Sequence, residues 1–181
     1  ATVESTQAKV EDFEELVRLH RRCIYRFILA SVRNTDAAQA LTQECFLRSY
    51  CKRGSFRGQA SVKTWLMKIA INLVRDFGRN RRLQFWKRLS ASGVDPGDVS
   101  ECLPDAAISP EDRASLNEQV QTIWRASRNL PDRQRTVFLL RFVEDMDLLE
   151  IAAATGMKEG TVKIHLFRAI HTIREKLGRS R

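Results

Sequence analysis

Six residues near the C-terminus have the types and the spacing needed to contact nucleic-acid bases. Wound as a helix at about 100° per residue, they share one face and its shoulder: Thr161, Lys163, Ile164, Phe167, Arg168 and His171. Hydrogen-bond donors beside apolar atoms suit a helix lying in the DNA major groove, where base edges and thymine methyl groups are accessible. Periodicity alone is equally consistent with the solvated face of an ordinary helical hairpin.

The opposite side of the same segment carries an apolar stripe that positions this face. The stripe runs from Val162 through Ala169 to Leu177 at helical spacing, and a shorter apolar run at 148–152 precedes it and stops at Gly156. Two helices joined by a tight turn containing glycine are the signature of a helix-turn-helix. We therefore expect Gly156 to adopt a positive φ and Val162 to pack back on the first helix.

A second candidate surface lies in the middle of the chain, on a helix expected over Val62–Arg79. About 120° or more from its core seam, this helix has a polar face that includes Trp65, Asn72, Arg75 and Arg79. A tryptophan beside Asn and Arg, next to a glycine-containing loop, forms a platform on which unpaired bases can stack while phosphates are neutralised. The alternative is a half-buried core tryptophan with a solvated basic face.

The charge distribution favours a polyanionic partner. The 181-residue chain has 31 Lys and Arg against 22 Asp and Glu, a net charge of +9. Residues 48–88 contain twelve of the basic residues and a single acid, whereas residues 95–112 contain six acids and no base. This segregation predicts a polyanion-binding body and an acidic connector that stays off nucleic acid.

The four cysteines predict neither a metal site nor a cofactor. Cys23, Cys45, Cys51 and Cys102 show no C-x-x-C pair and no histidine at ligand spacing, so thiols in a reducing cytosol are favoured over disulfides. No apolar run approaches the ~20 residues that span a bilayer, and no signal-peptide pattern opens the chain. These features predict a cytoplasmic protein without membrane insertion.

Apolar periodicity predicts an all-α chain, because no segment shows the alternation of a strand. The expected helices cover residues 11–32, 36–50 and 62–79, then one starting near Ser109, one following Pro131, and the helix-turn-helix. Residues 84–108 are rich in Ser, Gly, Pro and acids, which is typical of a flexible linker. We thus divide the chain into an N-terminal three- or four-helix bundle (1–83), an acidic linker (84–108) and a C-terminal four-helix domain (109–181).

Four motifs, in order along nearly the whole chain, resemble those of the extracytoplasmic-function (ECF) group of bacterial RNA polymerase sigma factors. LTQECFLRSY (41–50) is similar to the family's polymerase-binding helix, and residues 56–82 resemble its promoter-melting segment. LPDRQRTVFLLRF (130–142) and EGTVKIHLFRA (159–169) resemble its second domain. Each motif alone is weak, but four in register are specific. The resemblance implies two helical domains that bind core RNA polymerase and promoter DNA.

The resemblance assigns polymerase binding to the first motif and the residues just before it. The matching positions are Gln39, Leu41, Gln43, Glu44 and Phe46. In the family this helix docks on a coiled coil of the largest polymerase subunit. Gln39-Ala40 replaces the usual Glu-Asp pair, which predicts a polymerase affinity that is lower or depends more on Gln43 and Glu44.

Recognition of the downstream (−10) promoter element and strand opening fall, by the same resemblance, on a loop and the helix after it. The matching positions are Arg57, Gln59, Ser61, Lys63, Trp65, Asn72, Arg75 and Arg79. In the family a base is captured outside the stack here, which recovers part of the roughly few kcal/mol needed to unstack each step. Val62 stands where an aromatic residue is often found, so stacking is expected to rest more on Trp65.

Recognition of the upstream (−35) element falls on the helix-turn-helix. The matching positions are Lys158, Thr161, Lys163, Ile164, Phe167, Arg168 and His171, with Arg168 expected to contact guanine in a bidentate manner. Lys158 replaces the family's usual serine cap, a loss of ~1 kcal/mol, and is free to meet phosphate instead. Ile164 replaces a commonly polar residue, which predicts a shifted promoter preference. His165 and His171 are expected to contact phosphate or to face water.

These features predict a transcription initiation factor that is not an enzyme, because the polymerase does all the chemistry. The resemblance also implies a stress- or signal-responsive gene set and an anti-sigma factor, often membrane-anchored, as a partner. A free-standing helix-turn-helix regulator would instead bind duplex DNA without polymerase, usually as a dimer. A nuclease would need clustered carboxylates for a metal, and the basic half contains a single acid.

Overall fold

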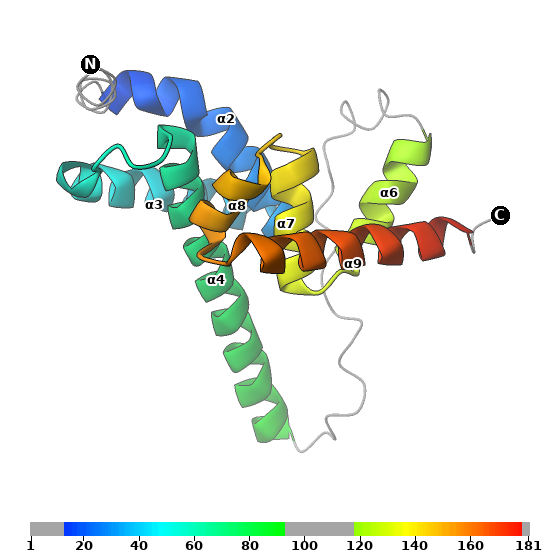
Figure 1. Cartoon of the computed structure of the whole chain (residues 1–181). Coiled ribbons are helices and arrows are strands. Elements are labelled where there is room, and N and C mark those ends of the chain that lie inside the picture. The colour runs from blue at the N-terminus through cyan, green and yellow to red at the C-terminus, as the bar shows by residue number, and fades with distance from the viewer. Residues whose placement is uncertain (1–12, 93–117, 179–181) are drawn as a thin grey trace.

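The computed structural model describes residues 13–92 and 118–178. The elements are α2 (Phe13–Val32), α3 (Thr35–Lys52), the 3-10 turn η1 (Arg53–Ser55), α4 (Val62–Ser92), α6 (Glu118–Arg128), α7 (Asp132–Phe142), α8 (Leu148–Thr155) and α9 (Glu159–Gly178). No strand occurs in these two ranges, and the expected all-α fold is confirmed (Figure 1).

The N-terminal half is a bundle of α2, α3 and α4, each of which packs against the other two. Its core side chains include Ile24 and Phe27 from α2 and Leu66 and Met67 from α4, all fully buried. Asn34 begins α3, because its side chain accepts a hydrogen bond from the Ala37 amide at 2.7 Å. The bundle therefore holds α4 with one face in the core and the other outward.

The C-terminal half is built on α7, α8 and α9, with α6 packed against α7 and α9. Burial of Val137, Leu140, Ile151, Val162 and Ala169 joins these helices in one core. Val162 and Ala169 belong to the apolar stripe expected on the second helix of the helix-turn-helix. That stripe faces inward, as its spacing predicted.

Helix α4 is longer than the sequence analysis predicted. The helix was expected to end near Arg79 but continues to Ser92, so residues 84–92, which were assigned to the linker, are helical. Residues 79–92 contain neither Gly nor Pro, and the next breaker is Gly93. Arg, Lys, Gln and Leu are good helix formers, and this outweighed the missing apolar period. The rest of the predicted linker lies outside the described residues.

The two halves touch each other directly, which the sequence did not predict. Helix α8 packs against α4, and α7 packs against α2, so the first helix of the helix-turn-helix lies on the N-terminal bundle. In Figure 1, the C-terminal part of α4 projects away from this junction, and α9 crosses α7. The two halves are thus joined through the packing of α8 on α4 and of α7 on α2.

The three cysteines in the described ranges, Cys23, Cys45 and Cys51, are free thiols in this structure. Cys45 is fully buried and its Sγ lies 3.7 Å from the Leu66 carbonyl oxygen, whereas Cys51 is exposed. Burial, more than the neighbouring charges, raises the pKa of Cys45 to about 12. A thiol needs to ionise to react, so Cys45 should be inert in the folded chain.

We expect iodoacetamide at pH 8 to alkylate Cys51 and to spare Cys45 until the chain is unfolded, because Cys51 is exposed whereas Cys45 is buried and its burial raises its pKa. Mass spectrometry of proteolytic peptides after native and denatured labelling measures both sites. Equal labelling of the two under native conditions would contradict the buried position of Cys45.

Within residues 13–92 and 118–178, no helix is both long and apolar enough to span a bilayer.

Candidate nucleic-acid interface

The helix-turn-helix has a sharply defined turn. Asp147 caps α8 by accepting from the Glu150 amide at 2.7 Å, and Glu150 accepts from the Asp147 amide at 3.0 Å, which completes a capping box. Gly156 ends α8 with φ 73° and donates to the Ala152 carbonyl, so the expected positive φ is confirmed. These local bonds set the angle at which α9 leaves the turn.

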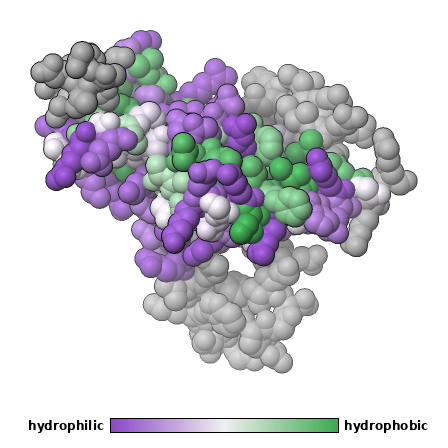
Figure 2. All heavy atoms as spheres, in the orientation of Figure 1, coloured by the Kyte–Doolittle hydropathy of each residue, from purple (hydrophilic) through white to green (hydrophobic). Residues whose placement is uncertain are grey.

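Helix α9 presents the predicted reading face to solvent. Lys163, Ile164, Phe167, Arg168 and His171 are exposed, with Ile164 at 53% and Phe167 at 70%. Figure 2 shows hydrophobic residues among hydrophilic ones over the side of the molecule on which α9 lies in Figure 1. An exposed phenylalanine and isoleucine next to arginine are costly on a purely solvated face and useful against thymine methyl groups and base edges. The geometry therefore favours base reading over the hairpin alternative.

Backbone hydrogen bonds and one ion pair stabilise the N-terminus of α9. The amides of Thr161 and Val162 donate to the Lys158 carbonyl at 2.9 and 3.1 Å, and Lys158 itself is exposed. Lys163 pairs with Glu159, four residues earlier on the same helix, at 2.6 Å and remains exposed. Thr161 is half-buried, the least accessible of the predicted upstream-element residues.

The two histidines of α9 differ in environment. His171 is exposed, and its Nδ1 lies 4.0 Å from Glu175. His165 is partly buried, and burial together with the charges of Arg133 and Arg168 lowers its pKa below the usual 6.5. His165 is therefore neutral near pH 7, which makes it a weaker phosphate ligand than the sequence analysis expected.

The outward face of α4 carries the second candidate surface. Asn72, Arg75 and Arg79 are exposed, and Arg79 pairs with Asp76 at 3.2 Å. Trp65 is half-buried, with its ring centroid 5.1 Å from that of Phe56. One side of the indole thus packs on the core and the rest stays accessible, a position between the two alternatives drawn from the sequence.

The loop before α4 is anchored at both ends. Phe56 is buried, and Gly58 has φ 66°, so the chain turns with Arg57 and Gln59 exposed on the outside. The Ser61 hydroxyl accepts from the Thr64 amide at 3.1 Å, which caps α4. Ser61 therefore has a structural role that the resemblance did not assign to it.

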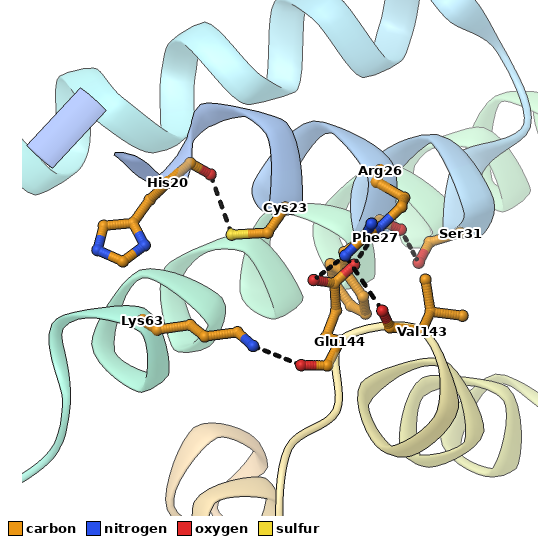
Figure 3. Close-up of polar contacts among 8 residues, drawn as sticks. All are labelled: His20, Cys23, Arg26, Phe27, Ser31, Lys63, Val143 and Glu144. Atoms are coloured by element: carbon orange, nitrogen blue, oxygen red, sulfur yellow. Dashed lines mark hydrogen bonds and ion pairs between the residues drawn. The ribbon is translucent and has the colours of Figure 1, made fainter. Parts of the chain in front are cut away.

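Two of the predicted downstream-element residues lie at the junction between the halves. Lys63 donates to the Glu144 carbonyl of the C-terminal half. Arg75 lines a cavity of about 320 Å³ between the halves, whose wall also includes Arg133 from α7. Lys63 is thus engaged by the C-terminal half (Figure 3), whereas Arg75 lines the cavity and remains exposed.

Three of the five predicted polymerase-binding residues, Gln39, Gln43 and Phe46, line a groove between α2 and α3. Gln39 and Gln43 are exposed on its α3 side, opposite Arg18, Arg21 and Arg22 of α2. Of the other α3 positions, Leu41 is half-buried and Glu44 pairs with Arg48 at 2.6 Å. Phe46 is only 7% exposed but is one of the residues that line the groove.

Comparisons with known proteins decide the family. Residues 16–84 match the family model of sigma-70 region 2, and residues 121–172 match that of sigma-70, region 4. The chain is 32% identical over 170 residues to the RNA polymerase sigma-H factor of Pseudomonas aeruginosa, covering 91% of this chain and 86% of that protein. It is 28% identical over 165 residues to the ECF RNA polymerase sigma factor SigW of Bacillus subtilis, covering 91% and 88%.

The chain belongs to the ECF sigma factors. It is an alternative sigma factor whose partners are core RNA polymerase and promoter DNA. A solved structure, the sigma factor RpoE of Bartonella quintana in complex with the anti-sigma factor NepR, matches with a TM-score of 0.71 and 25% identity. The match covers 94% of this sigma factor and 99% of that chain, so it extends over both halves.

Two exposed side chains of this sigma factor escaped the sequence analysis. Leu47 is 59% exposed and Tyr50 is 46% exposed on α3, the helix that carries Gln43. Leu47 follows Gln43 by four residues, so both lie on one side of the helix. Phe46 and Leu47 are neighbours in the chain, and the structure turns Phe46 inward and Leu47 outward.

Proposed function

We propose that this sigma factor uses α9 to read the upstream promoter element, the outward face of α4 to read and open the downstream element, and α3 to bind core polymerase. The carrying observation is the exposed face of α9, where Ile164, Phe167 and Arg168 project from a helix whose opposite stripe is buried. In this division the region through α4 serves polymerase and the downstream element. Residues 109–181 serve the upstream element.

For the upstream element, Arg168 is the residue proposed to contact a guanine, because it is exposed at the centre of the face. Ile164 and Phe167 supply apolar contact to thymine methyl groups. Contacts to the phosphates of the DNA backbone are assigned to the flanking residues Lys158, Thr161, Lys163 and His171. Phosphate contacts position the helix, whereas the central contacts carry sequence specificity.

For the downstream element, the accessible part of Trp65 stacks on an unpaired base, and Asn72, Arg75 and Arg79 follow the strand along α4. Arg57, Gln59, Ser61 and Lys63 surround the captured base at the end of the helix. Base–aromatic stacking contributes about 1–3 kcal/mol per base, which offsets part of the cost of opening the duplex.

For core polymerase, Gln39, Gln43 and Glu44 supply polar contacts, and Leu47 adds an apolar contact to that of Phe46, which lines the groove. Leu41 supports the helix from a half-buried position. A large exposed leucine beside polar side chains is typical of a protein contact surface.

We expect Leu47→Ala to weaken binding to core polymerase about tenfold, since truncating a central apolar contact commonly costs more than 1 kcal/mol. Leu19→Ala is the matched control, because Leu19 is 60% exposed against 59% for Leu47 but lies on α2 and not on α3, the helix proposed to bind polymerase. Fluorescence anisotropy of labelled chain titrated with core polymerase measures both. Equal affinities of the two variants would remove Leu47 from the contact surface.

Regulation by an anti-sigma factor is also proposed for this chain. The RpoE chain that it matches over both halves was solved with such a partner, and the two chains share 25% identity. The chain is proposed to act in the cytoplasm, where it meets polymerase, as a non-enzymatic factor for a stress- or signal-responsive gene set.

A gel-shift experiment separates this function from that of a free-standing regulator. Labelled promoter duplex is mixed with the chain alone, with core polymerase alone and with both. Specific retention only when both proteins are present supports the proposal. Tight specific retention by the chain alone would favour the regulator.

A further inference from the structure

The cavity of about 320 Å³ lies where α2, α4 and α7 meet the turn that follows α8. Its volume is at the lower end of the range of about 300–1,000 Å³ that is typical of pockets for small-molecule ligands. Part of its wall is apolar and includes Phe27, Ile71 and Phe77. Much of the rest is basic, so the wall suits a ligand that combines an apolar part with negative charge.

Arginines outnumber acids around this cavity. Asp132 is the single acid among the lining residues that the structure describes. One arginine directly follows α2, two belong to α4 and two belong to α7: Arg33, Arg75, Arg81, Arg133 and Arg135. Several positive charges around a small volume with partly apolar walls attract an anion more strongly than the same charges in open water.

Two of these guanidinium groups share one acceptor. Nη2 of Arg33 and Nη1 of Arg135 both donate to the Arg128 carbonyl, at 3.0 and 3.2 Å. The two groups therefore lie close together, and like charges at short distance repel each other. Asp132 pairs with Arg135 at 3.0 Å, but the Asp132 side chain is 66% exposed, so water screens its charge. A bound anion would stabilise both guanidinium groups.

The same two arginines occupy positions that are unfavourable by local criteria. Burial lowers the pKa of Arg135, although the charge of Asp132 raises it. Arg33 has φ 55° where α2 ends, a backbone conformation that glycine or asparagine adopts more readily. Side chains held at a local cost are common at binding sites. A ligand for the guanidinium groups gives a physical reason for arginine at both positions.

Hydroxyl groups in the wall already donate to the protein. Ser31, Thr136 and Thr155 each donate to a backbone carbonyl of their own helix, at 2.8, 2.8 and 2.6 Å, and Figure 3 shows this bond for Ser31. The guanidinium groups are therefore the main donors that a ligand can use. Their planar forks match the oxygens of phosphate groups in a bidentate manner.

Phe77 provides a flat apolar surface on the α4 side of the cavity. Arg81 lies over it, with Cζ 5.7 Å from the ring centroid. The next residue, Gly78, also lines the cavity, and a Cβ at this position would contact nothing within 4 Å. There is thus open space beside an aromatic ring and a guanidinium plane, and nucleobases stack on both kinds of group.

We propose that this cavity binds a free nucleoside polyphosphate, with its phosphates on Arg33, Arg133 and Arg135 and its base against Phe77 and Arg81. The phosphates supply the negative charge and the acceptor oxygens, and the base supplies the apolar part. A volume of about 320 Å³ holds one small molecule, whereas promoter DNA is a continuous strand. The proposal goes beyond promoter recognition and does not depend on it.

Isothermal titration calorimetry of the full chain with ATP and with GTP tests the proposal. About 0.15 M salt, where the Debye length is about 8 Å, screens attraction by distant surface charges. We expect saturable binding of one nucleotide per chain. Inorganic tripolyphosphate should bind about tenfold more weakly, because it lacks the base that stacks on the wall.

Arg133→Gln and Arg81→Gln each remove one charge from the wall, on two different helices, and each should weaken nucleotide binding about tenfold. Arg174→Gln is the matched control, because it removes the same charge from an exposed position of α9 outside the cavity. Gly78→Leu places a side chain in the open space beside Phe77 and should abolish binding. Gly78→Ala, which favours the helix similarly but adds little volume, should retain it.

Weaker binding by both cavity arginine variants, with Arg174→Gln equal to the wild type and helicity unchanged by circular dichroism, supports the site. Absence of saturable binding by both nucleotides would overturn it, and so would an equal loss in all three arginine variants. Equal affinity for tripolyphosphate would refute a nucleotide as the ligand. If Gly78→Leu loses helicity, the arginine variants decide.

A single-stranded oligonucleotide of the downstream element distinguishes a free nucleotide from one that is part of DNA. If the oligonucleotide binds through Arg133 and Arg81 while ATP and GTP do not bind, the cavity belongs to the path of the DNA and the proposed free ligand is wrong. Nucleotide binding that is lost in both cavity variants, with oligonucleotide binding unchanged, supports a separate site.

Discussion

Replacing Arg168 by alanine is expected to reduce transcription from the cognate promoter about 10- to 100-fold, because a bidentate contact to guanine contributes about 1–3 kcal/mol of discrimination. Arg168 is exposed on α9, so its loss should leave folding intact. Multiple-round transcription at limiting sigma factor, on promoter variants at each upstream position, measures the effect. The loss of transcription caused by Arg168→Ala should be greatest on the wild-type promoter. It should be nearly absent on the promoter variant in which the contacted guanine is replaced.

Arg174→Ala is the matched control for this prediction. Arg174 is an exposed arginine of the same helix, six residues further on and outside the predicted reading face. Its substitution removes the same charge and should change transcription far less. A loss that is equal for the two variants and uniform across promoter sequences would mean that Arg168 contacts phosphate and not a base.

The largest effect on stability is expected from Leu140→Ala, which should lower the free energy of unfolding by about 2–5 kcal/mol. Leu140 has 0% exposure in the core of α7, α8 and α9. Its truncation removes transfer free energy and leaves a cavity. Since small domains are stable by about 5–15 kcal/mol in total, this change should unfold a measurable fraction of molecules.

Leu149→Ala provides the comparison, because the same side chain is removed at a position that is 67% exposed. Its effect should lie within about 0.5 kcal/mol of zero. Urea unfolding followed by circular dichroism gives both values. Similar midpoints for Leu140→Ala and Leu149→Ala would show that the described core of the C-terminal half is wrong.

The parts of the fold set by local chemistry could be predicted from sequence. Glycine at position 156 and apolar spacing around Val162 were sufficient for the helix-turn-helix, because a left-handed turn and a buried stripe leave direct marks on residue types. The same spacing placed Arg168 and its neighbours outward. For these elements, positions within about one helical turn decide the structure.

Features that depend on distant residues could not be predicted. The contact between Arg26 and Glu144 joins residues that are 118 positions apart. From sequence alone, an acidic residue in a turn is expected to be exposed to solvent. The extension of α4 to Ser92 follows from helix propensity without an apolar period, so periodicity missed it. Phe46 and Leu47 are adjacent apolar residues, and only packing of α3 on its neighbours decides which one is buried.

Run-off transcription tests the central claim most directly. Core polymerase is incubated with a pool of genomic promoter fragments, with and without the chain, and the transcripts are sequenced. The account predicts discrete new transcripts that require the chain and disappear with Trp65→Ala, the residue proposed to stack on the captured base. No new transcript, together with specific duplex binding by the chain alone, would contradict it and leave a free-standing regulator as the explanation.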